Sequence, residues 1–213
     1  MRDYARSKRA FTLIELLTVI AIIGVLIALL FPAIKSALTK AEVSKAQHGV
    51  TDLATAFQHY YTEYGHWPVG DSTTSNLTYI VDTNFVALLQ GLNNTASLTA
   101  LTSFTYPPPP PTTPTSTSLL QGNPRGIHFL DIKQADLSTT LGFLDPWKQP
   151  YFCRFDVSYA NAVGNPFVNT ALGVNMNVNS GVLIWSAGPD GQFDDQGDAP
   201  SPSKLNKDNV KNW

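Results

Sequence analysis

The residues near the C-terminus of this 213-residue chain combine acidic side chains with glycines. Within nineteen residues lie Asp190, Asp194, Asp195, Asp198 and Asp208, alongside Gly188, Gly191 and Gly197. Carboxylate and carbonyl oxygens are the ligands that Ca²⁺ takes, about six to eight at a time, and a glycine-rich acidic loop can wrap around the ion. The spacing is not that of an EF-hand, so from the residues alone a solvated acidic loop is the default interpretation and a calcium site is the alternative.

Another carboxylate stands in an apolar stretch. Glu15 is the one charged residue in the run from Phe11 to Ile34. An unpaired carboxylate in hydrocarbon is costly, and such residues normally mark a function or find a partner. The alternative is a position at the membrane interface near the start of a helix, where a carboxylate suits the helix dipole.

Side chains that often carry catalysis are present without a recognisable arrangement. His48, His59 and His66 fall on or just beyond a predicted helix, His128 falls in a predicted strand, and none adjoins a Cys or Ser in a nucleophile pattern. The sequence has no glycine-rich phosphate loop, paired metal-ligand histidines or CxxC motif. The single cysteine, Cys153, excludes an internal disulfide and suits a half-buried strand position. We predict that the protein is not an enzyme.

The apolar run follows a basic segment. Residues 1–10 contribute +3 to a formal total of −2, and no second basic cluster follows, so nucleic-acid binding is not expected. We predict a basic leader at 1–10 and a membrane-spanning helix at 11–34, which would reach about 36 Å. The basic flank puts the N-terminal side in the cytoplasm and the large C-terminal part outside.

Residues 35–213 are expected to form a globular head. Apolar residues recur every three or four positions over 35–67, which predicts an amphipathic helix that continues the first and ends at Gly65. The long helix should bend or unwind most easily between Gly24 and Pro32. The aromatic residues near its end are expected in the core; they are Phe57, Tyr60, Tyr61, Tyr64 and Trp67.

The rest of the head divides by composition. Residues 71–142 are poor in charge and rich in Thr, Ser, Asn and Pro, and they predict a polar insertion with a short helix over 84–92 and a polyproline-like loop over 106–118. Strand patterns cover 126–132, 151–157 and 181–187, with a tight turn at 145–151. The fold class predicted is α+β: a long N-terminal helix packed on a small antiparallel sheet at 143–213, with a C-terminal acidic loop.

The stretch RAFTLIELLTVIAIIGVLIALLFP resembles the class III signal and N-terminal helix of type IV pilins and type II secretion pseudopilins. Phe11 matches the residue after the cut, Glu15 the glutamate at the fifth mature position, and Pro32 the helix proline. The resemblance implies that a prepilin peptidase cuts between Ala10 and Phe11 and methylates the new amine; the family usually has glycine in place of Ala10. It also implies that Glu15 pairs with the Phe11 amine of a neighbouring subunit.

The C-terminal part carries a second resemblance. The segments YYTEYGHWP, FLDPWKQPY and IWSAGPDGQFDDQGD, with the ending DNVKNW, resemble the major pseudopilin of type II secretion and similar proteins of Gram-negative bacteria. The likeness leaves out residues from about 71 to 125. It implies a calcium ion in the final loop, with Asp190 and the carbonyl of Ala187 as the best matches. The second ligand stays open among Asp194, Asp195 and Asp198, with Asp208 in the same cluster.

The function implied is that of a structural subunit. Such a chain would sit in the inner membrane with its head in the periplasm and, after processing, be polymerised with copies of itself by an inner-membrane assembly machinery. Its N-terminal helices, with Phe11, Glu15, Gly24 and Pro32, would pack in the core of a helical filament, either a periplasmic secretion piston or a surface fibre. The alternative is a monomeric, membrane-anchored calcium-binding periplasmic module.

Overall fold

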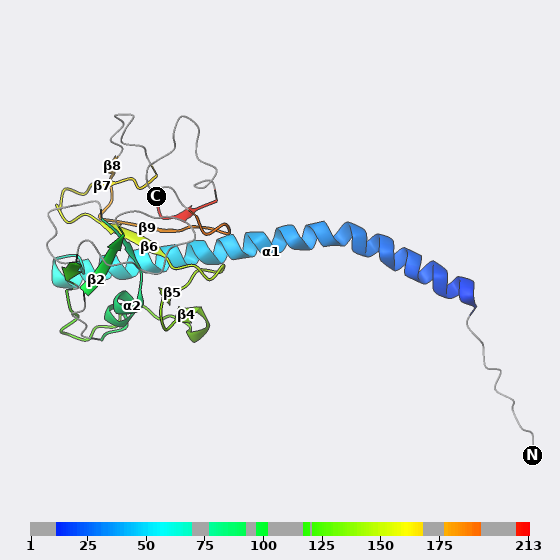
Figure 1. Ribbon diagram of the computed structural model, residues 1–213, viewed down its shortest axis with the longest axis horizontal. Helices are drawn as coiled ribbons and strands as arrows, with labels where there is room; N and C mark the ends of the chain where they lie inside the picture. The colour runs from blue at the N-terminus through cyan, green and yellow to red at the C-terminus, as the bar shows by residue number, and fades with distance from the viewer. Residues whose placement is uncertain are drawn as a thin grey trace, which may run out of the picture. The chain divides into compact units, whose positions relative to one another are not determined.

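A computed structural model describes residues 12–69, 77–92, 97–101, 117–119, 121–167, 177–192 and 208–213. The chain divides into two compact units, residues 1–41 and 42–213, and each is described by itself. Helix α1 (Leu13–Tyr64) contributes to both and is drawn from blue to cyan in Figure 1. The predicted fold class, a long helix packed on a small antiparallel sheet, is confirmed.

Helix α1 has the length and the end that the sequence predicts. Its 52 residues stop at Tyr64, where Gly65 takes a φ of +74° and donates its amide to the Tyr61 carbonyl at 2.8 Å. The helix is predicted to bend or unwind most easily between Gly24 and Pro32; helical structure is continuous through both residues, so it does not unwind there. A proline removes one backbone donor and leaves the hydrogen bonds of the adjacent turns in place.

The main sheet is antiparallel, with strand order β10-β9-β6-β1-β2-β3. Its strands are β1 (Thr78–Ile80), β2 (Ser97–Leu101), β3 (Thr117–Leu119), β6 (Phe152–Phe155), β9 (Val182–Ser186) and β10 (Val210–Lys211). Two short pairs accompany it: β4 (Leu137–Ser138) with β5 (Gly142–Phe143), and β7 (Val163–Gly164) with β8 (Asn177–Val178). The predicted strands over 151–157 and 181–187 are therefore confirmed as β6 and β9. They pair at Cys153 and Ile184.

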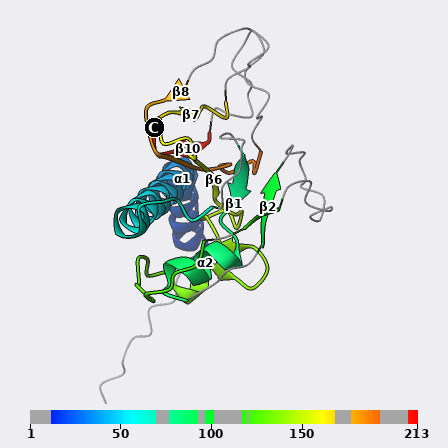
Figure 2. The same cartoon turned by 90° about the vertical axis from the view of Figure 1, so that its left-hand side faces the viewer.

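The head core lies between the sheet, the second half of α1 and the short helix α2 (Thr83–Leu89), and Figure 2 shows both helices next to β6, β1 and β2. On α1 the buried face includes Val50, Leu53 and Phe57. The Phe57 ring meets Phe85 of α2 and Phe155 of β6 edge to face, with centroids 5.5 and 5.0 Å away. The predicted aromatic cluster at the helix end is thus confirmed as part of the core.

Part of the predicted polar insertion at 71–142 is integral to the head. Strand β1 pairs with β6 in the middle of the sheet, and α2 buries Phe85, Leu88 and Leu89 completely. The 3₁₀ turn η1 (Gln134–Asp136) is tied to α1 by an ion pair of 2.6 Å between Lys45 and Asp136. The core therefore draws on this segment, and the predicted loop over 106–118 lies mostly outside the described residues.

The strand predicted over 126–132 is wrong. Asn123, fully buried, donates its side-chain amide to the carbonyls of Leu88 and Ile127 at 2.9 and 2.7 Å. The amides of Phe129 and Leu130 both donate to the Leu89 carbonyl. These backbone groups are satisfied by α2 and by one side chain, so the segment crosses the helix as an irregular strap instead of joining the sheet.

Candidate functional site

The start of α1 is built around Thr12 and Glu15. The backbone amide and the hydroxyl of Thr12 donate to Glu15 Oε2 at 2.9 and 2.7 Å, and the Glu15 amide donates to Thr12 Oγ1 at 3.3 Å. This is a capping box, in which each residue satisfies a backbone donor of the other. Thr12 was not among the predicted site residues, although the T-x-x-E spacing signals such a box. Ala10 and Phe11 lie outside the described residues.

The first half of α1 has an apolar surface that no other described part of the chain covers. Every residue from Thr12 to Lys45 is exposed, including Leu13 at 82% and Leu29 at 75%. Among the described residues, α1 is the helix long and apolar enough to cross a membrane. A side chain built at Gly24 would find nothing within 4 Å, and Pro32 lies inside this stretch. The surface therefore needs lipid or other helices around it.

The root of the acidic loop is ordered by its own backbone. Ala187 is buried directly after β9, and the Gly191 amide closes a turn onto the Gly188 carbonyl at 3.2 Å. The Gln192 amide donates to Asp190 Oδ1 at 2.9 Å. The predicted ligands Asp194, Asp195 and Asp198 lie outside the described residues.

Asp190 and Asp208, eighteen positions apart, are brought together at this root. Burial, followed by the negative charge of Asp190, raises the pKa of the Asp208 carboxyl above its ordinary value. Gly188, at a φ of +73°, packs so tightly on the Asp208 backbone that a Cβ there would collide with its carbonyl. Two carboxylates and nearby carbonyls form an oxygen donor set that suits Ca²⁺. The described residues hold no group of three or more acidic, histidine or cysteine ligands.

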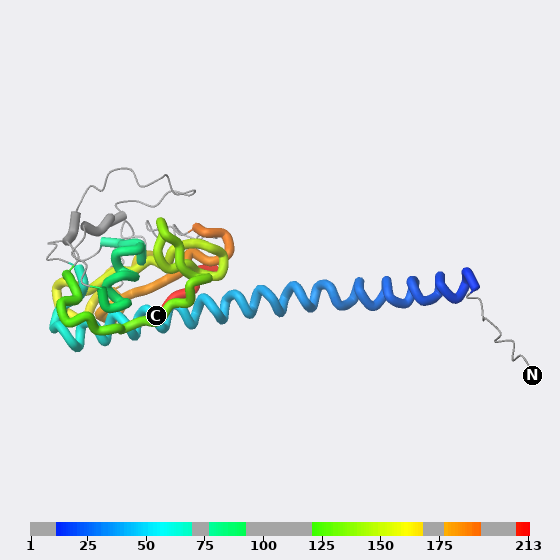
Figure 3. The backbone as a smooth tube through the Cα atoms, turned by 90° about the horizontal axis from the view of Figure 1, so that it is seen from below, coloured from blue at the N-terminus to red at the C-terminus, as the bar shows by residue number. Residues whose placement is uncertain are grey.

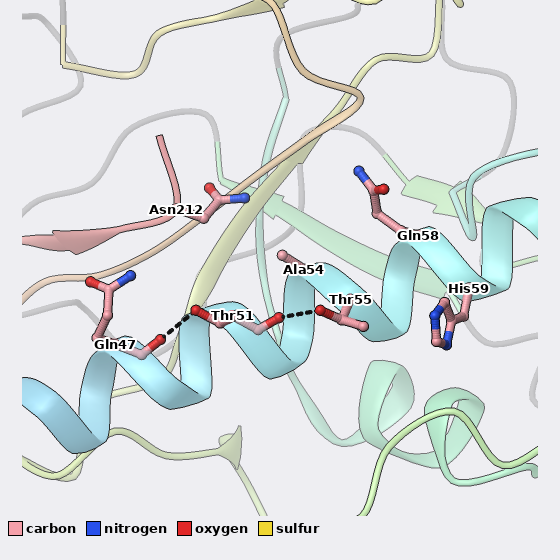
Figure 4. A pocket seen from close by; sticks show the side chains of 7 residues that line it. All are labelled: Gln47, Thr51, Ala54, Thr55, Gln58, His59 and Asn212. Carbon is pink, nitrogen blue, oxygen red and sulfur yellow. Dashed lines mark hydrogen bonds between the residues drawn. The ribbon is translucent and has the colours of Figure 1, made fainter.

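A shallow groove of about 310 Å³ runs along the head portion of α1 beside the C-terminal residues (Figure 4). Gln47 Nε2 donates to the Lys211 carbonyl at 3.2 Å, which holds this end of the chain beside the helix, as Figure 3 also shows. The hydroxyls of Thr51 and Thr55 donate to helix carbonyls four residues back, at 2.9 and 2.8 Å. His59 is the titratable group in the lining, without a Ser, Cys or acidic side chain beside it in the groove. The groove thus offers amide and threonine groups and the imidazole of His59.

Comparison with known proteins supports the N-terminal motif. The family described as the prokaryotic N-terminal methylation motif matches residues 5–31. A fimbrial protein of Neisseria meningitidis serogroup B is 39% identical over 70 residues, which are 33% of this chain and 41% of that protein. Fimbrial protein EcpC of Eikenella corrodens is 34% identical over 79 residues, 37% of this chain and 51% of that protein.

Type IV major pilin protein PilE1 of Neisseria gonorrhoeae is 38% identical over 66 residues, 31% of this chain and 40% of that protein. The chain spans about half or less of the length of these curated relatives. No solved structure matches the chain significantly. The motif at residues 5–31 and these relatives show that about a third of the chain is similar to type IV pilins and fimbrial proteins.

Proposed function

We propose that this chain is a structural subunit that polymerises through α1 into a type IV pilus-like or type II secretion pseudopilus filament. The observation that carries the proposal is the exposed apolar surface of α1 from Leu13 to Ile34, which belongs to a chain with a well-packed head. In water this surface is unfavourable, so it requires lipid before assembly and the helices of other copies afterwards.

Before assembly, α1 would span the inner membrane with residues 1–10 in the cytoplasm and the head in the periplasm. A prepilin peptidase would cut between Ala10 and Phe11, and an inner-membrane assembly machinery would then extract the subunit. The methylation motif at residues 5–31 supports this processing step.

Glu15 would set the position of each subunit by pairing with the Phe11 amine of a neighbour. In the single chain, donors from Thr12 partly satisfy the Glu15 carboxylate. A positively charged amine neutralises that carboxylate as well as bonding to it, and charge pairing gains strength in a low-dielectric filament core. Replacing the Thr12 donors of the Glu15 carboxylate by the charged amine of a neighbour therefore favours the polymer over the single chain in the membrane.

The test is to recover the chain from cells that contain their own assembly system. Mechanical shearing should release the wild-type chain in filaments that an antibody against the head labels in electron micrographs. A Glu15→Leu variant should stay in the membrane fraction. Wild-type chain found solely as a membrane monomer would contradict the proposal and support the alternative, a monomeric membrane-anchored calcium-binding periplasmic module. The location of the filaments distinguishes the two kinds of polymer: filaments in the periplasm would indicate a secretion piston, and filaments on the cell surface would indicate a surface fibre.

We also propose that the acidic loop binds Ca²⁺. The approach of Asp190 to Asp208 supports this proposal, because a cation would neutralise two carboxylates that otherwise repel each other. These two residues and the Ala187 carbonyl would hold the ion, with further oxygens from among Asp194, Asp195 and Asp198. Thermal unfolding of the full chain in detergent should shift upward with Ca²⁺ relative to chelator, and Asp190→Ala should abolish the shift. Identical melting of the wild-type chain in Ca²⁺ and in chelator would contradict the proposal.

A further inference from the structure

Ser186 joins three parts of the head at the root of the acidic loop. It is the last residue of β9 and is fully buried. Its backbone is in register with Val210 of β10. Its hydroxyl donates to Asp145 Oδ2 at 2.6 Å and accepts the Gly188 amide at 3.0 Å. One side chain therefore links the turn before β6 to the first residues of the loop.

Asp145 gives this link a fixed direction. It is fully buried, and its Oδ1 accepts the amides of Trp147 and Gln149 at 3.0 and 2.8 Å. An ionised carboxylate accepts hydrogen bonds and donates none, so the Ser186 hydrogen must point to Asp145. The lone pairs of Ser186 Oγ are then left for the Gly188 amide, which holds the backbone of Gly188 in place.

The position of Gly188 decides where the two loop carboxylates lie. Its left-handed backbone carries the chain into the turn that contains Asp190, and it packs directly on the backbone of Asp208. Asp208 in turn precedes Val210 by two residues, and Val210 is the residue that pairs with Ser186. Both sides of the acidic loop thus begin at Ser186, one through its hydroxyl and the other through its backbone.

We infer that Asp145 and Ser186 are positioning residues for the cation site: they hold the loop root so that Asp190 and Asp208 converge before any ion binds. The inference rests on the calcium proposal above and adds two residues that touch no ion. Its physical content is preorganisation, because a loop already held in its binding geometry loses less conformational freedom when the ion arrives.

The head contains a second serine–aspartate pair that serves as a control for this chemistry. Asp156 is 1% exposed, and it accepts the hydroxyl of Ser158 at 2.6 Å in the turn after β6. It also accepts the amide of Ser158 at 3.1 Å. The hydroxyl donor, the distance and the burial of the aspartate match those of Asp145 and Ser186, whereas Ser158 itself is exposed. No described hydrogen bond connects Ser158 to the residues of the acidic loop. Removing the Ser158 hydroxyl takes a hydrogen bond from a buried aspartate without disturbing the loop root.

The experiment measures Ca²⁺ binding to the full chain in detergent by calorimetric titration, with the thermal midpoint in chelator as a second readout. Both Ser186→Ala and Ser158→Ala should lower the midpoint in chelator. Ser186→Ala should raise the half-saturating Ca²⁺ concentration by about tenfold, which corresponds to the loss of one well-formed hydrogen bond, whereas Ser158→Ala should leave that concentration unchanged.

A second variant keeps the test decisive if Ser186→Ala does not fold. Asp145→Asn keeps the side-chain volume but can present an N–H to Ser186, which removes the fixed direction of the link, so it should weaken Ca²⁺ binding as well. Wild-type affinity in either folded variant, or equal weakening in Ser158→Ala, would overturn the positioning role while the calcium proposal stands. A wild-type chain that binds no Ca²⁺ would overturn both, and filament recovery would still test the polymer independently.

Discussion

Thr12 and Glu15 satisfy each other at the first turn of α1: two donors of Thr12 reach Glu15 Oε2 at 2.9 and 2.7 Å, and the Glu15 amide returns a hydrogen bond to Thr12 Oγ1 at 3.3 Å. Glu15 therefore has a local structural role as a capping residue besides the proposed pairing with the amine of a neighbour. The two roles differ in one respect, because capping needs an acceptor and pairing needs a charge.

Glu15→Gln separates these roles. Glutamine serves in a capping box as well as glutamate does, but it carries no charge. We predict that this variant keeps the helix start and loses filament assembly, measured as chain recovered in the sheared fraction. Thr12→Ala is the complementary variant. It should weaken the helix start by about 1 kcal/mol while leaving the charge, so filaments should still form. If the Glu15→Gln variant assembled normally, Glu15 would act only as a helix-capping residue and the proposed charge pairing would be wrong.

Gly49 is predicted to be required for the packing of α1 on the sheet. A Cβ at this position would overlap the hydroxyl and ring of Tyr151, whose side chain is buried under the helix. Gly49→Ala should destabilise the head by about 1–3 kcal/mol through overpacking, measured by denaturant unfolding of the full chain in detergent. Gly24→Ala is the control, because its Cβ meets nothing within 4 Å, and it should leave head stability unchanged. Equal stability of the two variants would contradict the close contact.

Lys148 holds a backbone conformation that glycine adopts more easily. Its φ is +68°, and its Nζ donates to the exposed Ala135 carbonyl at 3.1 Å. Relief of the left-handed strain is worth about 1 kcal/mol, so Lys148→Gly should raise the thermal midpoint by about 2–4 °C. Lys148→Ala loses the same charge and hydrogen bond but keeps the strain, so it should not melt higher than the wild-type chain. If glycine and alanine at this position melted alike, strain at Lys148 would not limit stability.

Asp145 makes head stability depend on pH. Burial raises the pKa of its carboxyl, more than the hydrogen bonds from Ser186, Gln149 and Trp147 lower it. The folded chain then holds this proton more tightly than the unfolded chain, so its contribution to stability is full below the ordinary Asp pKa and is lost as pH rises through the raised value. We predict that the wild-type chain gains stability relative to Asp145→Asn on acidification from pH 7 to pH 4. Parallel melting curves across that range would contradict the shift.

The sequence alone was sufficient for elements that local patterns encode. The length of α1, its end at Gly65 and the paired strands β6 and β9 follow from apolar periodicity and turn residues. The segment over 126–132 has the same strand-like composition, yet its backbone bonds to α2 and to the buried side chain of Asn123. Composition does not reveal which partner a backbone group will find.

Within the candidate site, the interacting residue pairs differ in how far apart they lie in the sequence. Thr12 and Glu15 are three positions apart, so their capping box was readable from the sequence, whereas Asp145 and Ser186 are separated by 41 positions and meet only through the pairing of β6 with β9. Asp190 and Asp208 were predicted to share a loop, and the β10 register explains how they approach. Long-range pairs of this kind depend on topology that no local pattern specifies.

The most direct test of the polymer is the N-terminal sequence and intact mass of the chain in filaments sheared from cells. We predict a chain that begins at Phe11, carries a methylated amine and lacks residues 1–10. A chain that retains Met1 and is never recovered in any polymer would contradict the proposed function at its centre.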